Sequence, residues 1–151
     1  YEKAIEVLQH ALTLDPTNIQ GRYHLGLALC HEGECSNDLS FLEKGIEELQ
    51  LVVQQDPEDE TAWSDLGMAY MHVAELTQDP ADKQVRASLY DLAEQKFLQA
   101  LALGSEQVYY HLACLYSLQE NGPDSYHYLV KAYERNTLPP VSDVLDDRWL
   151  E

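Results

Sequence analysis

The sequence predicts an all-α protein, an α-solenoid of stacked helical hairpins with two elongated hairpins, and three observations lead to this prediction. Apolar residues recur every three or four positions through most of the 151 residues, which is the period of a helix with one buried face. Turns that contain Asp-Pro separate these stretches, because proline cannot continue a helix. One pattern of large and small residues is repeated along the chain.

The clearest copy of this pattern lies between residues 63 and 100. It reads Trp63-x2-Leu66-Gly67-x2-Tyr70 and, later, Ala93-x3-Phe97-x2-Ala100. At Gly67 the missing side chain lets two helices cross closely, and Phe97 is expected to fill the gap. The large residues around Gly67 fill the groove between the helices, and the two alanines let the second helix approach.

This pattern resembles the helix–turn–helix signature of the tetratricopeptide (TPR) repeat. Altered copies are Leu25-Gly26-x2-Leu29 and Tyr109-x2-Leu112-Ala113-x2-Tyr116. The resemblance implies a TPR array over residues 1–138, in which the second helix of a first repeat is followed by three repeats. Residues 139–151 would form a C-terminal capping segment. Because the chain lacks an initiator Met and starts at a second helix, we expect it to be a fragment of a longer protein.

Five helices are expected before the last repeat, over residues 1–14, 19–32, 38–55, 59–76 and 79–103. Asp15-Pro16 and Asp56-Pro57 end two of them, and Gly104 ends the fifth. Asp79 is an N-cap followed by proline at the first helical position.

The last repeat places a helix around residues 109–116, a turn at Asn121-Gly122-Pro123, and a second helix that carries Leu129 and Ala132. Pro139-Pro140 then breaks the chain. We expect an amphipathic segment beyond it to cover the open end of the array, through Val141, Val144, Leu145 and Trp149.

The repeats differ in length by whole helical turns. From the last core position of each first helix to the small residue of its partner, the spacings are 16, 23 and 9 residues. Lengthening both arms of a hairpin by one turn adds about 7 residues. The third hairpin, which has the longest spacing, should therefore carry two extra turns in each arm and project beyond its neighbours by about 11 Å. In that reading Val73 and Leu76 face Val85 and Leu89. The alternative is a flexible insert over residues 78–84.

The net charge of −18 excludes two classes of partner. It repels phosphate backbones and anionic headgroups, so neither nucleic acid nor a membrane surface is expected as a ligand. The acidity fits either a well-solvated surface or a basic partner. Three cysteines without framework spacing favour a reducing, cytoplasmic setting, and no apolar stretch is long enough to cross a bilayer.

The first helix of each repeat should line a concave face that binds a peptide segment of a partner protein. Helical spacing assigns the following residues to that face: Gln20, Tyr23, Leu27, His31, Thr61, Ser64, Met68, His72, Gln107, Tyr110, Cys114 and Ser117. This surface is mildly apolar and lacks Lys, so it does not suit a clamp for carboxylate tails. We expect a peptide with apolar anchors, in one version with basic flanks. The alternative is that these side chains only pad the helix surface.

No chemistry is expected from this chain. Its only cluster of metal-ligand residue types is Cys30-His31-x3-Cys35 with His24, which lacks paired spacing, so we predict no metal, no cofactor and no enzymatic activity. Tyr126, Tyr128 and Tyr133 form either an exposed aromatic patch or a contact with the segment beyond Pro140.

The sequence therefore predicts a protein–protein interaction scaffold. The alternatives are a cytosolic secretion-type chaperone and an oligomerisation or spacer module, with self-association as one outcome.

Overall fold

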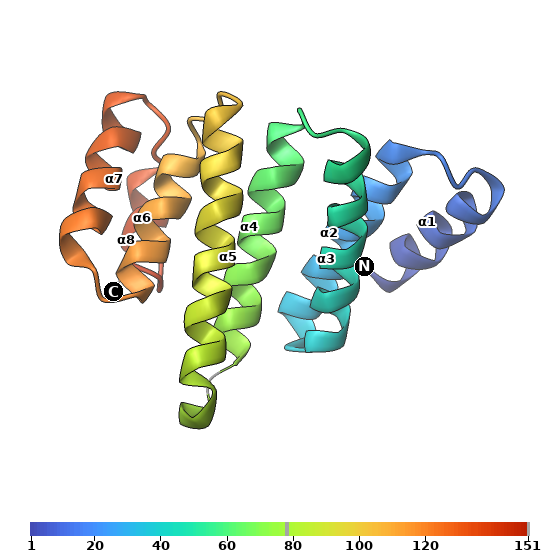
Figure 1. Ribbon diagram of the computed structural model, residues 1–151, viewed down its shortest axis with the longest axis horizontal. Coiled ribbons are helices and arrows are strands. Elements are labelled where there is room, and N and C mark those ends of the chain that lie inside the picture. Colours follow the sequence, from blue (N-terminus) through green and yellow to red (C-terminus); the bar gives the residue numbers. More distant parts are fainter. Residues whose placement is uncertain (78, 151) are drawn as a thin grey trace.

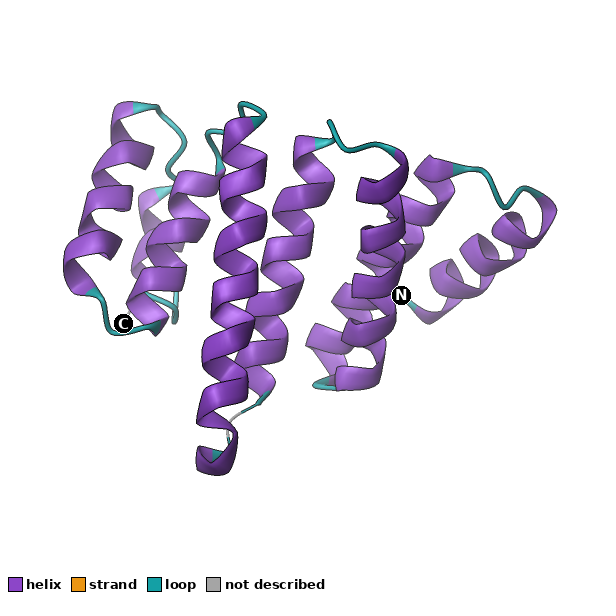
Figure 2. Cartoon of the chain, viewed as in Figure 1, coloured by secondary structure: helices purple, strands orange, loops and turns teal. Residues whose placement is uncertain are grey.

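The chain folds into a row of antiparallel helices that stand side by side (Figure 1). The computed structural model describes residues 1–77 and 79–150, and within these residues the regular structure is helical throughout, without a strand (Figure 2). The helices are α1 (Glu2–Leu14), α2 (Ile19–Ser36), α3 (Leu39–Gln55), α4 (Glu60–Leu76), the 3₁₀ turn η1 (Pro80–Asp82), α5 (Lys83–Ala102), α6 (Val108–Leu118), α7 (Gly122–Glu134) and α8 (Val141–Leu145).

These helices form hairpins in two layers. The hairpins are α2–α3, α4–α5 and α6–α7, and α1 packs on α2 at one end of the row. Helix α4 contacts both α2 and α6, whereas among the described residues α3, α5 and α7 do not contact one another. The layer of α2, α4 and α6 is therefore the tighter one and lies on the inside of the curve. We refer to these as the inner helices and to α3, α5 and α7 as the outer helices. The predicted α-solenoid is confirmed.

The junction predicted around Gly67 is present between α4 and α5. A Cβ atom at Gly67 would lie 2.6 Å from Cε1 of Phe97, whose side chain is fully buried. Leu66, Ala93 and Ala100 are also completely buried around this contact. The glycine is thus required by the close approach of the two helices rather than by its backbone angles.

Trp63 in the α4–α5 hairpin and Arg22 in the α2–α3 hairpin each bond to the turn that precedes their helix. Trp63 donates from its indole nitrogen to the carbonyl oxygen of Pro57 at 2.9 Å, which ties α4 to the preceding turn. Arg22 donates to the carbonyl oxygen of Pro16 at 3.1 Å and pairs with Glu48 at 2.6 Å. The guanidinium therefore replaces the indole as the donor to the Asp-Pro turn.

Short polar side chains set the starts of the helices. Asn18, Asp38, Asp59 and Asp79 each accept a hydrogen bond from a backbone N–H two or three residues later. These bonds satisfy donors that a first helical turn leaves free. At the other end of α5, Gly104 adopts a φ of 103°, which confirms the predicted stop.

The predicted elongation is present, but its distribution differs from the expectation. Helices α4 and α5 contain 17 and 20 residues against 11 and 13 in α6 and α7. Compared with α2–α3, which has 18 and 17 residues, only the return arm has grown. The reason is that Asp79 caps a 3₁₀ turn that leads directly into α5. This hairpin projects beyond its neighbours (Figure 1).

The contacts along the projecting arm were predicted in part. Val73, Leu76 and Leu89 pack against the core, whereas Val85 is 52% exposed. The alternative of a flexible insert is wrong for residues 79–84, which form η1 and the start of α5; Gln78 lies outside the described residues. Helix α2 also runs four residues past its predicted end, through Gly33, where a Cβ would lie 2.7 Å from Cγ of Leu42.

Candidate peptide-binding site on the concave face

The twelve residues predicted for the concave face lie on or at the start of the inner helices, but they differ in accessibility. Gln20, His31, Thr61 and Gln107 are exposed. Tyr23, Leu27, Met68, His72 and Ser117 are half-buried. Ser64, Tyr110 and Cys114 are buried. The face is therefore continuous across three helices, with an open part and a covered part.

The seam between α2 and α4 is lined by tyrosine and carboxylates. The Tyr23 hydroxyl donates to Oδ2 of Asp65 at 2.7 Å, and burial together with this carboxylate raises the pKa of Tyr23. Burial also raises the pKa of Asp65. Further along, Nε2 of His72 lies 3.2 Å from Oε1 of Glu34. Helical spacing did not assign Asp65 and Glu34 to the concave face, because Asp65 lies next to an assigned position of its helix and Glu34 lies beyond the predicted end of its helix.

The open part of the face carries two apolar side chains of different character. Met68 packs against the main core cluster, so its outer edge alone is available. Leu27 is half-buried and does not belong to either core cluster of the described residues. An apolar side chain of this kind is free to contact a ligand, whereas a core residue is not.

The seam between α4 and α6 contains a half-buried histidine, His111. Nδ1 of His111 lies 3.4 Å from Oγ of Ser64, and the imidazole packs beside Phe97 with ring centroids 5.5 Å apart. Burial lowers the pKa of His111 to about 4. The imidazole is therefore neutral at physiological pH and belongs to the helix interface rather than to a reactive centre.

Residues 139–150 cover the rest of the face. The carboxylate of Asp147 accepts a hydrogen bond from the Tyr110 hydroxyl at 2.6 Å and lies 3.7 Å from Sγ of Cys114. The Trp149 ring packs on His72 at a centroid distance of 4.9 Å. Burial raises the pKa of the Cys114 thiol to about 12.

This arrangement corrects two expectations. Tyr110 and Cys114 were predicted to face an open groove, but they are 8% and 1% exposed because the segment lies on them. The segment was predicted to close the end of the array, yet its side chains Asp147 and Trp149 lie against the inner helices. Only some of its predicted apolar residues pack: Val144 and Trp149 do, whereas Val141 and Leu145 are 74% and 78% exposed.

The tyrosines of α7 do not contact this segment as a group. Tyr126 and Tyr133 are 71% and 74% exposed. Tyr128 instead stacks on Tyr116, with ring centroids 5.4 Å apart and planes only 5° from parallel. The aromatic patch of α7 is therefore made of two tyrosines, two helical turns apart, rather than three.

Two cavities adjoin the covered part of the face. One of about 350 Å³ is lined by Gln107, Tyr110, His111 and residues 136–139, next to the start of α6. A small one of about 70 Å³ holds Arg148 together with His72, Glu34 and Glu75. Arg148, which is exposed, thus lines the same cavity as a carboxylate of α2 and one of α4.

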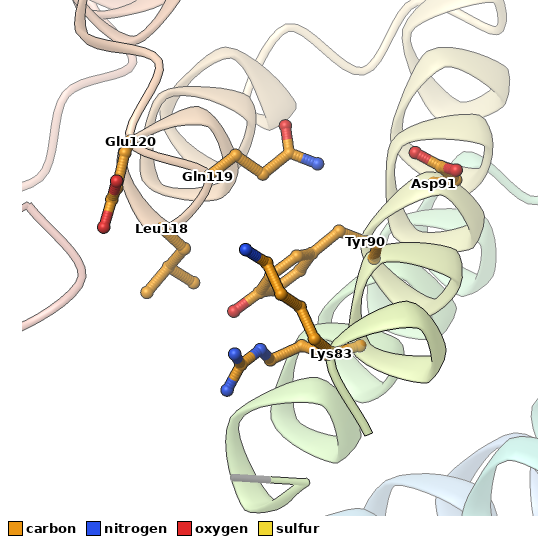
Figure 3. A pocket seen from close by; sticks show the side chains of 8 residues that line it. Lys83, Tyr90, Asp91, Leu118, Gln119 and Glu120 are labelled. Atoms are coloured by element: carbon orange, nitrogen blue, oxygen red, sulfur yellow. The ribbon is translucent and has the colours of Figure 1, made fainter. Parts of the chain in front are cut away.

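A further cavity lies between the first turns of α5 and the end of α6. It has a volume of about 550 Å³ and is formed where the projecting arm of α5 passes the end of α6. Lys83 and Tyr90 extend from α5 toward Leu118 and Gln119 (Figure 3). Its lining combines the cations Lys83 and Arg86 with the carboxylates Asp91 and Glu120, so it has no net preference for one sign of charge.

The candidate metal ligands of α2 do not come together. Cys30 is buried against α3, where a Cβ at Gly45 would lie 2.5 Å from its sulfur, while Cys35 is exposed. Within residues 1–77 and 79–150, no group of three or more His, Cys, Asp or Glu side chains is arranged to hold a metal ion. No helix of that part combines the length and apolarity needed to cross a bilayer.

The fold defines a class of protein, a helical-hairpin solenoid with a concave face and an outer layer. Comparison with known families identifies the repeat: residues 1–31, which span α1 and most of α2, match the family model of the TPR repeat. This match agrees with the sequence pattern for the first part of the chain, and TPR repeats in general mediate protein–protein interaction. A comparison with curated proteins found no match.

Proposed function

We propose that this chain is an interaction scaffold that binds a peptide segment of a partner protein on its concave face. The observation that carries the proposal is the docking of residues 147–149 on the inner helices. A stretch of polypeptide without regular structure is held there by side chains of α4 and α6. A surface that holds one such stretch has the shape and the polar partners to hold another.

The open part of the face favours a particular kind of segment. Leu27 and the outer edge of Met68 would contact an apolar anchor. The carboxylates Asp65 and Glu34 lie between the same helices and would attract basic residues that flank the anchor. A secretion-type chaperone would be one special case of this mode, in which the bound segment belongs to an exported protein.

The proposal is tested by selecting peptides from a random library on the chain and mapping where they bind. We expect Leu27→Asp to weaken binding of selected peptides at least tenfold, because it replaces the apolar contact by a charge. Leu98→Asp is the matched control, since Leu98 lies on α5, in the outer layer, and is 41% exposed. The binding site is mapped by the chemical-shift changes that a selected peptide causes in the NMR spectrum of the chain. Changes on the outer helices, together with binding that Leu27→Asp does not weaken, would contradict the proposal.

Self-association is a second candidate, and the exposed tyrosines of α7 favour it. Tyr126 and Tyr133 lie on the last outer helix, where a further hairpin or a second copy would stack. Sedimentation over a range of concentrations tests this candidate. A dimer that is lost in Tyr126→Ser/Tyr133→Ser would support it, and a concentration-independent monomer would exclude it for this chain.

A further inference from the structure

The turn at residues 147–150 has the conformation of a preformed ligand. The backbone N–H of Leu150 donates to the carbonyl oxygen of Asp147 at 3.0 Å. The carboxylate Oδ1 of Asp147 accepts from the backbone N–H of Trp149 at 2.9 Å. The turn is therefore held by its own hydrogen bonds. Its side chains are left to make the contacts with the inner helices.

Three consecutive side chains of this turn meet three different environments. Asp147 accepts from the Tyr110 hydroxyl of α6. Arg148 lines the small cavity that contains Glu34 and Glu75. Trp149 packs on the imidazole of His72. The acidic and the aromatic residue thus contact complementary groups on α6 and α4, and the exposed basic residue lies at a cavity that also contains two carboxylates.

The attachment of the segment has the features of a reversible contact. Helix α8 approaches no other helix of the described residues to within 8 Å between Cα atoms. Val141 and Leu145 contribute little, because both are largely exposed, so Val144, Trp149 and Leu150 supply the apolar contacts of the segment. The indole nitrogen of Trp149 is buried and finds no acceptor within residues 1–77 and 79–150. An unsatisfied buried donor opposes docking, so an occupant that supplied an acceptor would be held more firmly.

We propose that residues 147–149 act as an internal occupant of the concave face and leave it when a partner segment binds there. The partner segment carries the same order of side chains: a carboxylate, a cation and an aromatic ring. This inference rests on the proposed function and specifies both its partner class and its regulation. The internal segment competes at a high effective concentration, because it is part of the same chain.

The thiol of Cys114 reports whether the segment is docked, because Asp147 covers it. The experiment measures the rate at which a maleimide labels Cys114, by mass spectrometry of the resulting peptides. We expect Trp149→Ala to raise that rate at least tenfold. Tyr110→Phe, which removes only the hydroxyl that holds Asp147, should raise it several-fold. Val141→Ala is the matched control within the segment and should leave the rate unchanged.

Two other thiols serve as internal references. Cys30 is buried where α2 meets Gly45 of α3 and does not contact Asp147, so its labelling rate should stay constant unless the protein unfolds. Cys35 is exposed and gives the rate of an open thiol. If Cys114 in Trp149→Ala is labelled as slowly as in the wild type, the internal occupant is refuted. A parallel rise at Cys30 also refutes it, since the segment would then be a structural part of the fold.

A peptide supplied in trans tests the partner class. The probe is a capped peptide with the sequence of residues 142–150, Ser-Asp-Val-Leu-Asp-Asp-Arg-Trp-Leu. At millimolar concentration it should restore the slow labelling of Cys114 in Trp149→Ala. The same peptide with alanine in place of Trp149, or with a scrambled order, should not. Failure of the native peptide to protect Cys114, or equal protection by the scrambled one, overturns the proposed order of side chains.

The two proposals can fail separately. Library peptides that require Leu27 but leave Cys114 labelling unchanged would support the scaffold function and contradict competition with the internal segment. Library peptides that bind the outer helices would contradict the scaffold function as proposed. In that case a faster reaction of Cys114 in Trp149→Ala would still identify the segment as a detachable occupant.

Discussion

Gly67 and Phe97 set the closest approach between α4 and α5. The side chain of Phe97 is fully buried, so its ring has no space into which it could withdraw. The ring atoms Cε1 and Cδ1 lie 2.6 and 2.7 Å from the position of a Cβ at residue 67, closer than real Cβ contacts. Any side chain at this position therefore has to separate the helices.

We predict that Gly67→Ala lowers the free energy of unfolding by about 1–3 kcal/mol, the usual cost of overpacking a core. Gly122→Ala is the control, because a Cβ at Gly122 meets no atom within 4 Å. That variant should be as stable as the wild type or slightly more stable, since alanine favours a helix. Urea denaturation measures both. Equal effects of the two substitutions would show that the close approach is not a tight constraint.

His111 makes the stability of the fold depend on pH. Its pKa is lowered by burial to about 4 in the folded chain, whereas an unfolded histidine takes up a proton near its ordinary value of 6.5. The unfolded state therefore binds more protons between these values. The stabilisation is fully present above pH 6.5 and is lost as the pH falls toward 4.

We expect the wild type to lose up to about 3 kcal/mol more stability than His111→Gln between pH 7 and pH 4, since each pKa unit corresponds to about 1.4 kcal/mol. Glutamine stays neutral and is able to hydrogen-bond with Ser64, whose hydroxyl now lies beside the imidazole. Other titrating groups affect both proteins alike, so the difference between the two curves isolates residue 111. Parallel curves would mean that the histidine is not buried in its neutral form.

At the scale of elements, α5 is longer than α4, so one part of α5 packs against other helices and its first turns do not. The first turns of α5 pass beyond the end of α6, and Val85 there is half-exposed. Packing begins at Leu89 and Tyr90, whose hydroxyl donates to Glu75 of α4. The core positions Ala93, Phe97 and Ala100 follow.

Amide hydrogen exchange should therefore vary along this single helix. We expect amides of residues 86–88 to exchange at least a hundredfold faster than those of residues 93–100, because few buried contacts oppose local opening at the free end. Helix α3 provides the comparison, as Leu42 and Ile46 are already buried near its start. Uniform protection of the amides along α5 would contradict this expectation, because the projecting turns would then be as stable as the buried part of the helix.

At the scale of the whole molecule, charge opposes the compact state. The chain carries 27 acidic and 9 basic residues, and only a few of the latter are paired with carboxylates in the described part. Repulsion among the remaining carboxylates destabilises a fold that holds them close together. Salt shortens the range of this repulsion.

We predict that 0.5 M NaCl raises the melting temperature at pH 7.5 by several degrees. The control is the same measurement at pH 4.5, close to the isoelectric point of about 4.4, where the net charge nearly vanishes and salt should have little effect. Sucrose at pH 7.5 separates screening from general exclusion of cosolute. An equal response to salt at both pH values would exclude charge repulsion as the cause.

The sequence by itself determined the hairpins. The signals for the hairpins are local or nearly local, because each depends on residues within one helix or one hairpin. They are the helical period of the apolar residues, the Asp-Pro turns, the Asx caps and the Gly67–Phe97 pair. They also placed the twelve candidate residues on the inner helices. The same signals predicted the longer hairpins but not which arm is lengthened. The position of the turn depends on the single 3₁₀ turn that Asp79 caps.

Only the tertiary structure decided which part of the concave face is covered. The contacts of Asp147 with Tyr110 and of Trp149 with His72 join the C-terminal segment to α6 and α4, which are distant from it in the sequence. No helical period relates such residues, and an amphipathic segment is equally suited to the end of a row and to its inner surface. The choice depends on side chains that meet only after the inner helices have packed against one another.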